Sequence, residues 1–257
     1  MIISHRHRYL FVELPHTAST AISKELREQY DGQAILRKHA YYHDFLRIAS
    51  EDEKSYFVFS GIRNPLDETV SLYFKYRTDH MAFYTNPKHR KSQGGHVTEI
   101  HMEKYRFISQ QDGGFTDYLQ RFHRLPYDNW SSLAHHKFDY VIRFEQLQAG
   151  FAHVLGLLGI EPKRPLPAIN VTDERQQEFY RYYTPDVRER AVWVFGPFME
   201  RWGYEFPAEW GDCPIPLSSR VLFRTLAVYR NFRRQYLRGG GLDRILTRLS
   251  LWRYRQS

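Results

Sequence analysis

Small and hydroxylated residues fill a short stretch near the start of the chain, Pro-His-Thr-Ala-Ser-Thr at residues 15–20. An apolar run at residues 9–13 precedes the stretch, and residues 20–30 follow it with a pattern typical of a helix. A loop of this kind directs backbone N–H groups and the positive end of the helix dipole toward one anion. The residues predicted to bind a phosphate-like group are Pro15, His16, Thr17, Ala18, Ser19 and Thr20.

A second set of candidate phosphate ligands follows the apolar run at residues 56–60. Arg63 comes directly after this run, and Ser71 lies two turns into the next helical pattern, residues 66–77. An arginine forks onto phosphate oxygens, and a serine hydroxyl donates to them. Because parallel strands end at one edge of a sheet, both loops are expected to face one crevice and a ligand with two separated phosphates.

The 15–20 stretch contains no glycine and no lysine, so it does not match the triphosphate loop G-x-x-x-x-G-K-[ST]. Instead, Leu14-Pro-His-Thr-Ala-Ser-Thr-Ala21 resembles the 5′-phosphosulfate loop of sulfotransferases that use 3′-phosphoadenosine 5′-phosphosulfate (PAPS). The segment at residues 62–73 resembles the 3′-phosphate motif of that family, with Arg63 and Ser71 in its two phosphate-binding positions. Residues 138–147, 166–170, 182–186 and 202–204 resemble later landmarks of the carbohydrate-type enzymes, Golgi-type and bacterial.

The resemblance spans roughly residues 8–207. It implies an α/β fold with a P-loop-like three-layer core and a central, mostly parallel sheet. It also implies sulfuryl transfer from PAPS, as donor substrate, to a hydroxyl, with a carbohydrate as the favoured acceptor. Such a transfer needs in-line placement of the reacting groups and a base for the hydroxyl proton.

Histidine is the side chain best matched to act as a base at neutral pH. His39, in Arg37-Lys-His-Ala40, lies where related enzymes often carry a Lys-His pair with the catalytic histidine. The resemblance therefore makes His39 the first candidate for the base. His43 is the second, because a spacing of four residues would place it on the same helical face as His39.

Two positions depart from the family pattern. His16 stands where the family has a lysine that contacts the bridging and sulfuryl oxygens of the donor. A neighbouring anion raises the pKa of a histidine, so His16 is predicted to be protonated beside the donor and to share in catalysis. This replacement also leaves open a degenerate protein that binds nucleotide or glycan without turnover. Glu68 replaces a common arginine and is predicted to weaken only a peripheral contact.

Further residues are given supporting roles. Arg143 and Glu145 are expected to pair structurally beneath the site, with contact to the acceptor as the alternative. Tyr73 is expected to pack in the core, with a place beside the nucleotide as the alternative. The histidines lack the H-E-x-x-H spacing and paired Cys/His spacing of metal sites, so no metal is predicted. The polar stretch at residues 78–104 is expected to form a long loop or a mobile lid. Within it, residues 80–104 are expected to face the acceptor or simply to be solvated.

The charge of +8 is distributed unevenly along the 257 residues. Residues 215–257 hold ten arginines and one acid, a charge of +9, whereas residues 1–214 carry a charge of −1. We therefore divide the chain into a sulfotransferase domain, residues 1–214, and a basic amphipathic helical tail, residues 215–257. The basic and aromatic pattern of residues 218–255 suits an anionic membrane surface, and packing on the body or on a second copy in a homo-oligomer is the equal alternative.

The composition excludes several other classes. Cys213 is the only cysteine, so no disulfide framework exists, and no apolar run is long enough for a transmembrane helix or a signal peptide. The expected location is cytoplasmic, with peripheral attachment at the inner membrane surface. No nucleic acid partner is predicted, because apolar residues dominate one face of the tail. A membrane-surface adaptor acting through this tail remains a rival function.

Overall fold

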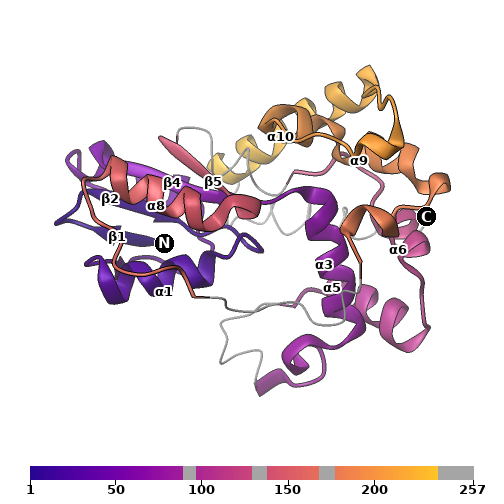
Figure 1. The fold of residues 1–257 in the computed structure, drawn as a ribbon, viewed down its shortest axis with the longest axis horizontal. Helices are drawn as coiled ribbons and strands as arrows, with labels where there is room; N and C mark the ends of the chain where they lie inside the picture. Colours follow the sequence, from indigo (N-terminus) through magenta and orange to yellow (C-terminus); the bar gives the residue numbers. More distant parts are fainter. Residues whose placement is uncertain (89–96, 129–137, 168–176, 237–257) are drawn as a thin grey trace.

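The computed structural model describes residues 1–88, 97–128, 138–167 and 177–236. Five strands form one mixed sheet with the order β3-β1-β2-β4-β5 (Figure 1). The strands are β1 (Ile2–Ser4), β2 (Tyr9–Val12), β3 (Gln33–Ala34), β4 (Phe57–Ile62) and β5 (Tyr140–Arg143). The strands β2, β4 and β5 are parallel, and β1 runs antiparallel to β2 and β3. The α/β core predicted from the sequence is confirmed.

Side chains alternate between the two faces of the sheet, as the period of a strand requires. Tyr9, Phe11 and Phe59 face the apolar sides of α1 (Ser19–Gln29) and α8 (Leu147–Leu157). On the opposite face, the main buried contacts join Leu10, Val12 and Val58 to Tyr42 and Phe45 of the short helix α2 (Tyr42–Leu46). The three layers are therefore unequal: two long helices cover one face and one short helix covers the other.

A group of helices lies beside the sheet and forms a second apolar core (Figure 1). Its members are α3 (Pro65–Arg77), α5 (Glu99–Tyr105), α6 (Phe115–Phe122) and α9 (Pro185–Trp202). Asn64 caps α3 by accepting a hydrogen bond from the N–H of Leu66 at 2.9 Å, and Pro65 occupies the first helical position. Because α3 follows β4 directly, it connects the sheet to this helical group.

Most predicted elements are confirmed within one or two residues. The stretch at residues 78–104 is an exception, because α5 forms within it where a loop was expected, and residues 89–96 lie outside the described residues. Tyr105 at the end of α5 is buried in the helical core, and this burial explains the helix. Tyr73 is also buried there, where its hydroxyl donates to the carbonyl of Gly113, so the core role expected for it is confirmed.

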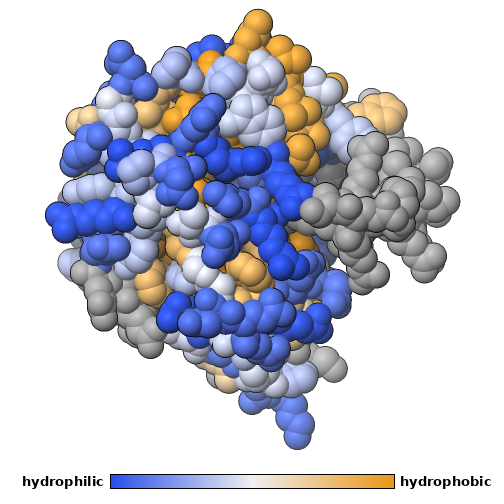
Figure 2. Space-filling model, turned by 90° about the vertical axis from the view of Figure 1, so that its right-hand side faces the viewer, coloured by the Kyte–Doolittle hydropathy of each residue, from blue (hydrophilic) through white to orange (hydrophobic). Residues whose placement is uncertain are grey.

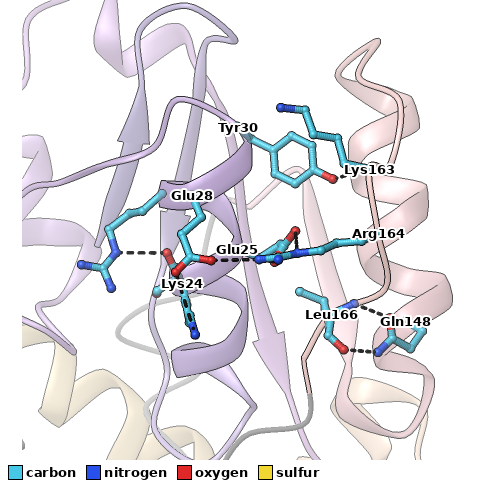
Figure 3. A network of polar contacts seen from close by, with 10 residues as sticks. Lys24, Glu25, Glu28, Tyr30, Gln148, Lys163, Arg164 and Leu166 are labelled. Carbon is cyan, nitrogen blue, oxygen red and sulfur yellow. Dashed lines mark hydrogen bonds and ion pairs between the residues drawn. The ribbon is translucent and has the colours of Figure 1, made fainter.

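A polar network fastens the far end of α1 to the segment before Leu166 (Figure 3). Arg164 donates three hydrogen bonds to the fully buried Glu25, two from Nε at 3.0 Å and one from Nη2 at 2.8 Å, and a fourth from Nη2 to Glu28 at 2.8 Å. Gln148 of α8 exchanges two hydrogen bonds of 2.9 Å with the backbone of Leu166. The network therefore joins the helix that follows the 15–20 loop to α8.

The first half of the tail forms α10 (Leu217–Tyr236), which packs along α9. Ser219 donates to the carbonyl of Trp193, Arg220 pairs with Glu200 at 2.8 Å, and Phe223 is buried. The predicted second helical stretch, at residues 242–255, lies outside the described residues. Of the helices that the structure describes, none combines the length and apolar character needed to cross a membrane.

Candidate functional site

The 15–20 loop connects β2 to α1 through two residues in the left-handed backbone region. His16 has a φ of 64° and Ala18 a φ of 57°. A residue with a Cβ loses roughly 1–2 kcal/mol in this conformation, so the surrounding structure must hold the loop in place. The N-cap residue of α1 is Ala18, whose side chain makes no capping hydrogen bond. The first N–H groups of α1 lack acceptors within their own helix and remain available to an anion.

One internal hydrogen bond and close packing on β4 hold this loop in place. Thr17 is fully buried, and its hydroxyl donates to the carbonyl of Leu14 at 3.0 Å. Gly61 lies so close that a Cβ there would come within 3.1 Å of Thr17 Oγ1 and 3.2 Å of the Thr17 carbonyl oxygen. Of the loop hydroxyls, that of Thr17 is thus structural, and the close packing of loop on strand depends on a glycine.

His39 lies beside the end of β2 with its ring oriented by the backbone. Its Nδ1 is 3.1 Å from the carbonyl oxygen of Glu13, so Nδ1–H is the donor and Nε2 carries the lone pair. Burial, together with the charge of Lys38, lowers the pKa of His39 despite the opposing effect of the Glu13 hydrogen bond. The imidazole is therefore neutral near pH 7, as a general base must be before it accepts a proton.

His43 does not share a helical face with His39. His39 has a φ of 57° and precedes α2, which begins at Tyr42. The helical relation predicted from the spacing of four residues is therefore wrong, because the left-handed residue reorients the chain before the helix starts.

Lys38 links the histidine segment to the loop. Its ammonium donates to the Thr20 hydroxyl at 2.9 Å. The chain thus places a lysine against a loop whose own sequence contains none.

His16 is exposed to solvent but surrounded by positive charge. Desolvation by the surrounding protein is the main cause that lowers the pKa of His16 well below its ordinary value, and the charges of Lys75 and Arg63 lower it further. His39 and His101 also lower the pKa of His16. The structure thus brings side chains from four segments close to His16, and that histidine is neutral when no anion is present.

Arg63 lies beneath the 15–20 loop and is 8 % exposed. Its Nε donates to Asp67 at 2.7 Å, its Nη1 lies 3.5 Å from the His16 carbonyl oxygen, and its guanidinium stacks over the Phe144 ring at 4.2 Å. Ser71, the second predicted ligand of the 3′-phosphate, is 2 % exposed. Arg63 thus adjoins the loop, and a phosphate would have to displace Asp67 to reach its Nε.

Glu68, which replaces a common arginine of the resembled motif, is buried. Tyr127 donates its hydroxyl hydrogen bond to this carboxyl group. Burial raises the pKa of Glu68 to about 7, against the opposing effects of Tyr127 and Arg63. The carboxyl is therefore partly protonated at neutral pH and offsets little of the positive charge nearby.

Glu145 and Arg143 have structural roles, as expected, although each bonds to a different partner. Glu145 accepts from the backbone N–H of Asn64 at 2.7 Å and from the Tyr204 hydroxyl at 3.0 Å. Arg143 donates to the carbonyl of Trp202 at 2.7 Å and lies over the Tyr204 ring. These contacts hold the start of α3 and the end of α9 against β5.

Lys75 and His101 were not recognised as candidate site residues in the sequence. Lys75 follows Ser71 by one helical turn, so the α3 periodicity could have placed both on one face. His101 belongs to α5, within the stretch that was expected to be a loop. Among the residues that the structure describes, no group of three His, Cys, Asp or Glu side chains is arranged to hold a metal.

No protein-family model matches the chain, and no curated protein matches it. The crystal structure of mouse sulfotransferase SULT7A1 complexed with PAP is similar over 96 % of this chain and 90 % of that chain, at 13 % identity and a TM-score of 0.30. The likeness is a distant one of fold. The function of the site is therefore argued from its own residues.

Proposed function

We propose that the protein is a PAPS-dependent sulfotransferase that uses His39 as its general base and the hydroxyl of a carbohydrate as acceptor. The observation that carries the proposal is the hydrogen bond from His39 Nδ1 to the Glu13 carbonyl, which leaves Nε2 free to accept a proton beside the 15–20 loop. A base and an anion-binding loop at one edge of a parallel sheet are the two parts that sulfuryl transfer requires.

Each part has a distinct task. When bound, PAPS supplies the sulfuryl group and a phosphate leaving group. His39 Nε2 accepts the proton of the acceptor hydroxyl. Backbone N–H groups of residues 16–20 and the Lys38 ammonium stabilise the negative charge on the leaving group. His16 takes up a proton when the anion approaches, because the added negative charge raises its pKa.

Binding of the 3′-phosphate of the donor requires a larger rearrangement of the protein than binding of the 5′ group. Arg63 supplies positive potential from beneath the loop, and direct contact with a 3′-phosphate requires its ion pair with Asp67 to open. If that exchange does not occur, a nucleotide or glycan would bind without turnover. This degenerate binding protein is the principal alternative.

One experiment separates these alternatives. Transfer of labelled sulfate from PAPS is measured with glycans and small hydroxyl compounds as acceptors, and binding of adenosine 3′,5′-bisphosphate is measured by calorimetry. The proposal predicts both binding and transfer to a glycan. Binding without transfer to any acceptor favours the degenerate protein, and absence of binding contradicts both nucleotide functions.

A second candidate function concerns α10, whose apolar side chains are not all covered by the body. Leu217, Val221, Val228 and Phe232 are each more than half exposed. In Figure 2, apolar side chains gather at the upper end of the molecule, the level at which α10 lies in Figure 1. Arginines are interspersed along the same helix. We propose that the tail, residues 218–255, binds an anionic membrane surface from the cytoplasmic side.

Vesicle sedimentation tests this second function with phosphatidylserine-containing and neutral vesicles. The double variant Val228→Glu/Phe232→Glu is expected to abolish binding to the anionic vesicles, whereas Ile48→Glu, at an exposed apolar residue outside α10, is expected to retain it. Equal binding by both variants would exclude α10 as the membrane site. A change in molecular mass of the double variant would instead identify α10 as the contact of a homo-oligomer.

A further inference from the structure

Lys75 is a cation with no counterion among the residues that the structure describes. It lies half-buried on α3, one helical turn after Ser71. Among the described residues, it forms neither a hydrogen bond nor an ion pair, whereas Arg63 nearby is paired with Asp67 at 2.7 Å. A half-buried ammonium that lacks a counterion is unfavourable, and proteins place such groups where a ligand supplies the opposite charge.

The surroundings of Lys75 increase this imbalance. Burial is the main cause that lowers the pKa of the Lys75 amine, and the neighbouring charge of Arg63 adds to it. The negative charge of Glu68 raises the pKa of Lys75. However, Glu68 is buried and already accepts a hydrogen bond from the hydroxyl of Tyr127. The positive charge beside the 15–20 loop is therefore left for an external anion to neutralise.

Lys75 also lies near the residue that departs from the family pattern. Of the charged neighbours of His16, Lys75 lowers the pKa of that histidine the most. His16 occupies the loop position at which the resemblance expects a lysine, and a neutral imidazole there cannot supply the same charge. A lysine that reaches the same place from α3 would compensate for this replacement.

We propose that Lys75 is an anion-binding residue of this site and binds the terminal anionic group of the ligand that the 15–20 loop holds. The identification of the ligand as a nucleotide rests on the proposed function. The presence of an anion site does not. The ammonium of Lys75 donates hydrogen bonds to the oxygens of the 5′ group, which supplies the missing counterion. The lysine of the family loop is thus replaced from a different element.

Calorimetry with three probes tests the assignment on Lys75→Met and Lys75→Arg. The probes are pyrophosphate, adenosine 3′,5′-bisphosphate and adenosine 3′-monophosphate, which lacks the 5′ group. Lys75→Met is expected to weaken binding of the first two by about 10- to 100-fold and to leave the monophosphate within about twofold. Lys75→Arg retains the charge and is expected to recover part of the loss. A thermal melt checks that each variant is folded.

Lys54→Met is the matched control. Lys54 precedes β4 at the opposite edge of the sheet and pairs with Glu51 at 2.7 Å, so its loss is expected to leave all three affinities unchanged. Equal binding of the bisphosphate by wild type and Lys75→Met overturns the assignment while the proposed function stands. Lys75-dependent binding of pyrophosphate without binding of the bisphosphate supports the assignment and contradicts the proposed function. If the wild type binds no probe, both fail.

Discussion

The two strand-loop-helix units that start at β2 and β4 look alike in sequence but hold their polar groups differently. In the first, residues 15–20 form a loop in which His16 is exposed and Lys38 bonds to Thr20. In the second, Arg63 and Ser71 are buried, and Asp67 already neutralises Arg63. The first loop is thus accessible to a ligand, whereas most polar groups of the second loop already have partners within the protein.

This difference shows that the segment predicted to bind the 3′-phosphate has a structural role. Arg63 adjoins the His16 carbonyl, and Gly61 allows β4 to pass close to Thr17. Residues of the second unit therefore pack against the 15–20 loop of the first unit and stabilise it. Substitutions at residues beside the first loop should change chemistry, whereas substitutions at Arg63, Glu68 and Gly61 should change mainly stability.

The largest effect is expected from His39→Ala, which removes the proposed base beside the first loop. Transfer should slow by about 10²- to 10⁴-fold, the contribution typical of general base catalysis, while binding of adenosine 3′,5′-bisphosphate stays unchanged. Steady-state transfer and calorimetry measure the two properties. His43→Ala is the control and should retain activity within a fewfold range. Full activity of His39→Ala would remove His39 from the base role.

Arg63→Met should act mainly on stability. The substitution leaves the buried Asp67 carboxylate without its cation, and breaking a buried pair in this way costs about 3–5 kcal/mol of unfolding free energy. Urea unfolding measures the loss. The double variant Arg63→Met/Asp67→Leu should recover part of it, because no unpaired charge remains. Unchanged stability of the single variant would mean that the pair does not support the loop.

Glu68 gives the second unit a dependence on pH. The folded protein holds the pKa of Glu68 at about 7, above the ordinary value of 4.5, so the folded state favours the protonated carboxyl. The contribution of Glu68 to the free energy of unfolding is therefore greatest below pH 4.5 and falls as the pH rises toward 7. Urea unfolding at pH 5 and pH 8 should differ by about 2–3 kcal/mol more in the wild type than in Glu68→Gln.

The exposed Glu51 is a suitable control for this measurement, since Glu51→Gln should leave the pH dependence as it is in the wild type. A Glu68→Gln variant with the full wild-type pH dependence would assign that dependence to other groups.

The smallest effect is expected from Gly61→Ala, which tests the contact between the two units. The added methyl would press on Thr17 and should cost about 1–3 kcal/mol, with weaker binding of the bisphosphate as the loop shifts. Gly156→Ala in α8 is the matched control, because a Cβ there meets nothing within 4 Å. Equal stability of the two variants would show that the loop yields freely.

Elements with strong local signals were predictable from the sequence. The helical pattern at residues 66–77 matches α3, and the apolar run at residues 9–13 matches β2. By contrast, β1 and β3 contain three and two residues, too few for a period to be recognised. Their positions are set by pairing with the rest of the sheet, which no local pattern encodes.

The candidate site was predictable only in part, for a related reason. Topology alone places residues 15–20 and Arg63 at one edge of the sheet, as the sequence suggested. The burial of Arg63 depends on its pairing with Asp67 and stacking on Phe144, which are contacts of side chains packed in three dimensions. The roles of Lys75 and Glu68 likewise depend on which neighbours surround them. Spacing along the chain does not reveal such neighbours.

The clamp between Arg164 and Glu25 has a consequence for the order in which the protein is built. The two residues are 139 positions apart, and Glu25 is fully buried in the finished fold. During synthesis, α1 emerges long before Arg164, so the carboxylate of Glu25 stays hydrated until the later segment arrives. The helix that completes the 15–20 loop therefore acquires its final anchorage late, after most of the chain has left the ribosome.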